Sequence, residues 1–115
     1  MEEKRILIIC DSLDFLWISK ALRRRYVLEW AGNREDLLKY EDRADFDLLL
    51  IDITILRADS NLSEHFAAKH IPVIALSSEP YDARDKSLFK AGCSACYIKP
   101  FRQDKFVALV RDWIK

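Results

Sequence analysis

Four polar residues stand at the ends of short, wholly apolar segments, and their side chains are of types that can do chemistry. In the clearest case, Leu48–Ile51 runs directly into a carboxylate. An apolar run without alternation is typical of a strand that helices cover on both faces. Ligands of such open sheets bind beyond the carboxyl ends of the strands. The four residues expected at that edge are Asp11, Asp52, Ser77 and Lys99.

Two carboxylates, a hydroxyl and an ammonium at one sheet edge are suited to handling a phosphoryl group. Carboxylates bind hard cations such as Mg²⁺, which also bridge phosphate oxygens. A hydroxyl and a lysine can stabilise charge on a phosphoryl group in transfer, and a carboxylate can act as the nucleophile and form an acyl phosphate. Spacing alone leaves a plainer alternative open, in which Asp11, Asp52 and Lys99 are solvated charges at strand ends.

The elements that must position these residues alternate between strand and helix. Five strands are expected, at about Ile6–Cys10, Tyr26–Trp30, Phe46–Asp52, Ile71–Ser77 and Ala95–Ile98. Five helices are expected, over about Ser12–Arg25 (capped by Ser12), Arg34–Arg43 (capped by Asn33), Asn61–Lys69, Tyr81–Ala91 and Arg102–Ile114. The segment Ile53–Ser60 is expected to be irregular. Alternation of this kind predicts an α/β domain with a parallel sheet and right-handed crossovers.

Composition limits the class of protein. A chain of 115 residues is long enough for one domain, spanning 1–115, and too short for two. It has 19 basic and 19 acidic residues, so nothing in its charge indicates nucleic acid or an anionic membrane as a partner. No apolar run approaches the roughly 18 residues of a membrane span, and no secretion signal is expected. An odd number of cysteines without framework spacing indicates reduced thiols and a cytoplasmic location.

Four local segments add a family resemblance that covers essentially the whole chain. They resemble, in order, the signature segments of response-regulator receiver domains: Ile6–Ser12, Phe46–Asp52, Pro72–Ser78 and Tyr97–Phe101. The resemblance implies a single flavodoxin-like, CheY-like domain with strand order 2-1-3-4-5 and helices on both faces. It also implies transfer of a phosphoryl group from a histidine kinase or a histidine phosphotransfer protein onto an aspartate. The implied catalysis is limited to self-phosphorylation and dephosphorylation at that aspartate.

Roles carry over from the resemblance residue by residue. Asp52 matches the phosphoacceptor. Asp11 matches the acidic residue that ligates Mg²⁺, with Asp52 and the backbone carbonyl of Thr54 as further ligands. Ser77 matches the switch hydroxyl, and Lys99 matches the family's lysine. The implied cofactor is therefore Mg²⁺.

The chain also departs from the receiver pattern. Cys10 stands where receivers usually carry the first of two adjacent acids, so we expect weak Mg²⁺ binding. Cys96 stands at the aromatic switch position, and Tyr97 beside it must face the opposite side of the sheet unless the strand bulges. The interval from Asp52 to Ser77 is short and lacks the usual proline-glycine turn. These departures support an alternative hypothesis, a pseudo-receiver that binds protein partners without phosphorylation.

Cys93 and Cys96 form a CxxC pair that has two interpretations. Redox pairs usually sit at a helix N-terminus, which lowers the thiol pKa, whereas this pair follows an expected helix C-terminus. We therefore interpret both as small buried side chains and keep a thiol-based sensor as a third hypothesis. The last helix has a broad apolar face, on which Val107, Trp113 and Ile114 indicate a possible homodimer through the last helix and strand.

Overall fold

The computed structural model describes residues 3–40, 42–43, 45–58, 66, 68–77, 93–99 and 102–114. The expected helix Tyr81–Ala91 and most of the expected helix Asn61–Lys69 lie outside the described residues. Among the described helices, none combines the length and the apolar character that crossing a membrane requires.

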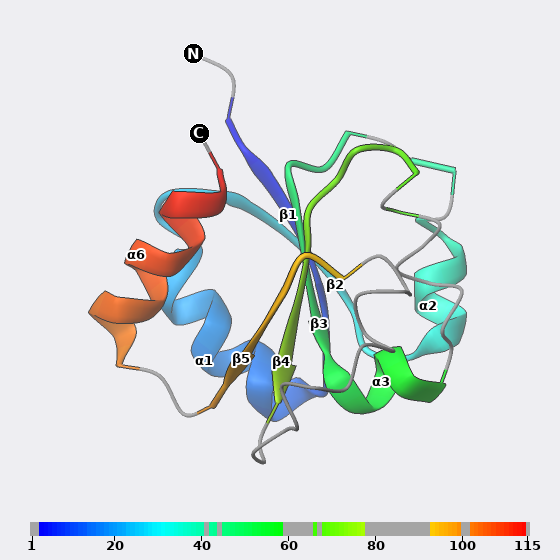
Figure 1. Ribbon diagram of the computed structural model, residues 1–115, viewed down its shortest axis with the longest axis horizontal. Coiled ribbons are helices and arrows are strands. Elements are labelled where there is room, and N and C mark those ends of the chain that lie inside the picture. Colours follow the sequence, from blue (N-terminus) through cyan, green and yellow to red (C-terminus); the bar gives the residue numbers. More distant parts are fainter. Residues whose placement is uncertain are drawn as a thin grey trace.

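A five-stranded parallel sheet forms the centre of the molecule (Figure 1). Its strands are β1 (Arg5–Ile9), β2 (Val27–Ala31), β3 (Leu48–Asp52), β4 (Val73–Ser77) and β5 (Ala95–Ile98). They lie in the order β2-β1-β3-β4-β5, and every neighbouring pair is parallel. The flavodoxin-like fold class and strand order predicted from the sequence are confirmed. Most expected strand bounds differ from the observed ones by one or two residues.

Helices cover both faces of the sheet. The described helices are α1 (Ser12–Leu22), α2 (Arg34–Leu38), α3 (Ile53–Ala58) and α6 (Gln103–Trp113). Figure 1 shows α1 and α6 on one face and α2 and α3 on the other. Successive residues of β1 divide between the two cores: Ile6 and Ile8 pack toward α1 and α6, and Leu7 and Ile9 pack toward α2 and α3. Burial on both faces explains why the strands lack alternation.

The expectation of an irregular segment after Asp52 is wrong, because α3 begins at Ile53. Ile53 and Leu56 lie three residues apart on this helix and are 4% and 1% exposed. Burial of these two side chains in the core favours a helical turn over a loop.

Two other helices also differ from expectation. Asp11 caps α1, not Ser12: the Asp11 side chain accepts a hydrogen bond from the backbone N–H of Asp14. This helix ends at Leu22, where the carbonyl accepts from the N–H groups of Arg25 and Tyr26. The cap at Asn33 is confirmed, although α2 ends at Leu38, earlier than expected.

Candidate functional site

Asp52 is the last residue of β3, and Thr54 orients its carboxylate. Oδ1 of Asp52 accepts hydrogen bonds from the backbone N–H of Thr54 at 2.9 Å and from its hydroxyl at 2.7 Å. Because α3 starts at Ile53, the first N–H groups of the helix have no partner within it, and the carboxylate provides one. The side chain is 17% exposed. The second oxygen, Oδ2, faces the ammonium of Lys99.

Lys99 is the residue that follows β5. Its ammonium lies 3.3 Å from Oδ2 of Asp52 and 2.6 Å from Oδ2 of Asp14, and its side chain is 10% exposed. The backbone N–H of Lys99 donates to the carbonyl of Ser77 at 2.6 Å, which continues the β4–β5 pairing beyond the strands. Ser77 itself is 4% exposed at the end of β4. The structure therefore brings Lys99 directly to Asp52, with Ser77 on the adjacent strand.

Asp14 belongs to the site, and the sequence analysis missed it. It lies in the first turn of α1, where Oδ2 pairs with Lys99 and Oδ1 accepts from the indole N–H of Trp17 at 3.0 Å. Its position held a signal: Asp14 is four residues before the buried Ile18, so it lies on the apolar stripe of the helix. An acidic residue on the apolar stripe is unexpected, because acidic residues usually lie on the solvent-exposed face of a helix.

Asp11 and Cys10 lie at the end of β1 and have different surroundings. The Asp11 side chain is exposed, and its Oδ1 accepts from the backbone N–H of Asp14 at 2.8 Å. Cys10 is 2% exposed, and its carbonyl accepts from the indole N–H of Trp30 at 2.9 Å. Burial, and then the nearby carboxylates of Asp14 and Asp11, raise the pKa of the Cys10 thiol to about 12. The position therefore carries no charge at neutral pH.

The surroundings of Asp52 and Lys99 favour the charged form of both side chains. Burial alone would raise the pKa of Asp52, but the hydrogen bonds from Thr54 and the nearby ammonium of Lys99 outweigh it and hold that pKa below its ordinary value. Burial alone would lower the pKa of Lys99, but its bond to Asp14 and the charge of Asp52 outweigh it and raise that pKa. In general, an ionised carboxylate can act as a nucleophile, and an ammonium beside it can stabilise charge that develops during the reaction.

The oxygen donors at this edge fit a hard divalent cation. Mg²⁺ keeps several waters and is usually bound through one or two carboxylates. Asp11 and Asp52 are carboxylates that follow or end two neighbouring strands, β1 and β3, and their role as Mg²⁺ ligands stays a prediction. In the part of the chain that the structure describes, no cluster of three or more acidic, histidine or cysteine side chains forms a metal site by itself.

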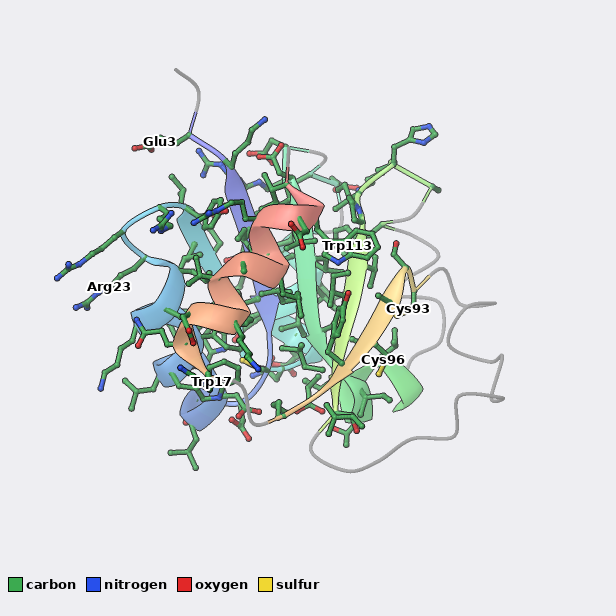
Figure 2. The ribbon with its side chains drawn as sticks, turned by 60° about the vertical axis from the view of Figure 1, so that its left-hand side comes forward. Glu3, Trp17, Arg23, Cys93, Cys96 and Trp113 are labelled. Carbon is green, nitrogen blue, oxygen red and sulfur yellow. The ribbon has the colours of Figure 1, made fainter. Side chains whose placement is uncertain are left out.

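The CxxC prediction of small buried side chains is confirmed. Cys93 and Cys96 are 4% and 8% exposed, and burial raises the pKa of the Cys93 thiol. Figure 2 shows Cys93 beside the start of β5 and Cys96 on that strand. Cys96 packs on the α2–α3 side of the sheet and Tyr97 on the α1–α6 side. The regular pairing of β4 with β5 contains no bulge, so Tyr97 does not take the place of the missing aromatic residue.

Comparison with known proteins supports the fold. No protein-family model and no curated protein matches this sequence. A response regulator from Thermotoga maritima superposes with a TM-score of 0.81 at 23% identity, covering 96% of this chain and 98% of that one. An orphan response regulator of H. pylori gives 0.79 at 20% identity, covering 97% of each chain.

A third similar structure is a CheY-like protein, TadZ, from Pseudomonas aeruginosa. It has a TM-score of 0.76 at 17% identity, and the match covers 96% of this chain and 98% of that one. At identities this low, similarity of structure establishes the fold, and the site must be argued from its own geometry. The chain has the fold of response-regulator receiver domains.

Proposed function

We propose that this chain is a receiver domain that accepts a phosphoryl group on Asp52 from a phosphohistidine of a histidine kinase or phosphotransfer protein. The observation that carries the proposal is the placement of Asp52: one oxygen is held by Thr54, and the other lies 3.3 Å from the ammonium of Lys99. This arrangement supports the proposal, because an oriented carboxylate can act as a nucleophile and a nearby ammonium can stabilise the phosphoryl group that it receives.

In the proposed step, a carboxylate oxygen of Asp52 attacks phosphorus while the phosphorus–nitrogen bond of the donor breaks. The bonding electrons return to the imidazole, which leaves neutral when its other nitrogen carries a proton. Lys99 offsets charge on the phosphoryl oxygens, and the hydroxyl of Ser77 is proposed to contact the same group. Asp11, Asp52 and the carbonyl of Thr54 would hold Mg²⁺, which when bound neutralises further phosphoryl charge.

A pseudo-receiver is the second candidate, and two observations favour it. Lys99 lies closer to Asp14, at 2.6 Å, than to Asp52, at 3.3 Å. The buried thiol of Cys10 stays uncharged, so this strand end contributes one negative charge fewer to a cation. Under this hypothesis the chain binds a protein partner in one state, without phosphorylation.

Intact-mass measurement after incubation with acetyl phosphate and Mg²⁺ separates the two candidates. A receiver gains one phosphoryl unit, and Asp52→Asn abolishes the gain. Asp112→Asn, which alters an exposed acid on α6, serves as the matched control and should behave as the unmodified chain does. No gain with acetyl phosphate or with a panel of histidine kinases would reject the receiver and leave the pseudo-receiver.

The homodimer is likewise a proposal. Ile98 on β5 is 44% exposed, and Trp113 on α6 donates its indole N–H to the hydroxyl of Tyr97 at 3.2 Å. Tyr97 and Trp113 pack together where β5 meets α6, and the exposed Ile98 follows Tyr97 on this edge strand. Sedimentation velocity of the phosphorylated and unmodified chain tests the proposal. A dimer that Ile98→Glu disrupts supports this surface.

A further inference from the structure

Asp14 connects the surroundings of Asp52 to α6. One carboxylate oxygen holds the ammonium of Lys99 at 2.6 Å, and the other accepts from the indole N–H of Trp17 at 3.0 Å. The Trp17 ring packs against Phe106 of α6, with 5.0 Å between the ring centroids. Figure 2 shows Trp17 on α1 beside the first part of α6. A continuous set of contacts therefore runs from Asp52 through Lys99, Asp14 and Trp17 to Phe106.

These contacts are specific rather than incidental surface pairings. The side chains of Lys99 and Asp14 are 10% and 20% exposed, so water screens their attraction less than it would at the surface. Hydrogen bonds between charged groups are shorter and stronger than neutral ones. Because both oxygens of Asp14 are engaged, its carboxylate is fixed in orientation, and it fixes the position of the Lys99 ammonium in turn.

Asp14 also supplies the charge that the strand end lacks. Cys10 is buried and bears no carboxylate, and the second anion that contacts Lys99 is Asp14, in the first turn of α1. Cys96, at the position where receivers usually carry an aromatic switch residue, packs on the side of α2 and α3. Trp17 and Phe106 pack on the opposite face, together with α6.

We propose that Asp14 is a positioning residue for Lys99, and that it transmits the state of Asp52 to Trp17 and α6. The second part rests on the proposed function. An acyl phosphate at Asp52 carries more negative charge than the carboxylate and draws the ammonium of Lys99 toward itself. The bond between Lys99 and Asp14 then weakens, Asp14 reorients, and the hydrogen bond to Trp17 changes.

The positioning role is tested without any phosphoryl group. Carbon-detected NMR titration of the lysine side chains gives the pKa of Lys99. Asp14→Asn should lower it relative to the unmodified chain, whereas the control Asp112→Asn should not. Asp14→Glu keeps the negative charge, so the pKa of Lys99 should stay close to its value in the unmodified chain. This variant separates a contribution of charge from a folding defect. An unchanged Lys99 pKa in Asp14→Asn would overturn the positioning role.

The transmitting role is tested through the indole N–H signals of the three tryptophans, each of which has a different acceptor. Acetyl phosphate with Mg²⁺ should shift the Trp17 signal, which is assigned with Trp17→Phe. The unmodified chain and Asp14→Asn are compared at the same phosphorylated fraction, measured by intact mass, and at that fraction the Trp17 shift should be lost in Asp14→Asn. An equal Trp17 shift in that variant would overturn transmission by Asp14.

The two measurements fail independently. A chain that takes no phosphoryl group, and shows no response to beryllofluoride with Mg²⁺, rejects the proposed function and transmission together. The Lys99 titration of the unmodified chain and its variants still decides whether Asp14 positions the lysine, because it needs no phosphoryl group.

Discussion

Cys10 gives the sharpest quantitative test of the site. Its thiol has a pKa raised from 9.0 to about 12, by burial first and then by the carboxylates of Asp14 and Asp11. A pKa that is higher by about three corresponds to a free-energy cost of about 4 kcal/mol for a negative charge at this position. Cys10→Asp restores the acid that receivers usually carry there. We expect it to reduce the free energy of unfolding by roughly 2–4 kcal/mol at pH 7 without Mg²⁺.

Cys10→Asn is the matched control, because it has nearly the same shape without the charge. The introduced carboxyl should have a folded-state pKa above its unfolded value, so its penalty is absent at low pH. The penalty grows as pH rises from the unfolded pKa, about 3.9, through the folded one. The two variants should therefore have similar stability near pH 3.5, and Cys10→Asp should be the less stable at pH 7.

Mg²⁺ should reverse the effect. A cation at 100 times its dissociation constant stabilises the folded state by about 2.7 kcal/mol. Urea unfolding followed by far-UV circular dichroism, with EDTA or with Mg²⁺, measures each quantity. Equal stability of Cys10→Asp and Cys10→Asn at pH 7 in EDTA would refute the argument that burial and the neighbouring acids disfavour a negative charge at position 10.

Three further predictions concern the ion pairs, α3 and the thiols. Lys99→Met leaves Asp14 and Asp52 without their cation and should cost about 2–3 kcal/mol at pH 7 in urea unfolding. Because the folded-state pKa of Asp52 is lowered, that difference should shrink as pH falls below about 4, and a gap independent of pH would contradict the pairing. Leu56→Ala should cost about 2–5 kcal/mol, since Leu56 is 1% exposed and α3 lies against the core; a loss below 1 kcal/mol would speak against that packing. All three thiols should resist a thiol reagent in the native state and react in urea; an oxidation-dependent shift that Cys93→Ser removes would instead revive the thiol sensor.

The sheet was predictable from the sequence because the physics that builds it is local. An apolar run such as Leu48–Ile51 buries both faces at once, so its lack of alternation indicates a covered, parallel strand. Its end at Asp52 then follows from the cost of burying a charge. The order of the strands came from the resemblance, since apolar runs alone do not specify which strands pair.

The role of Asp14 was harder to predict from the sequence, because it depends on how α1 packs across the sheet. Its partner Lys99 lies 85 residues away, and no local pattern pairs them. The helix α3 was missed for a different reason: Ile53 and Leu56 make only one turn of an apolar stripe, too short to distinguish from a loop. The cap was assigned to Ser12 although the neighbouring Asp11 is an equally good cap by type.

The capping role of the two acids has an evolutionary consequence. Asp11 caps α1, and Asp52 accepts from the backbone N–H of Thr54 in the first turn of α3. Replacing such a cap typically costs about 1 kcal/mol, whatever chemistry the acid performs. A lineage that abandoned phosphoryl transfer would still be selected to keep both acids for folding. In a receiver domain, acids that also cap helices would be under two separate selective pressures, one for phosphoryl transfer and one for folding, and a descendant can lose the first while it keeps the second.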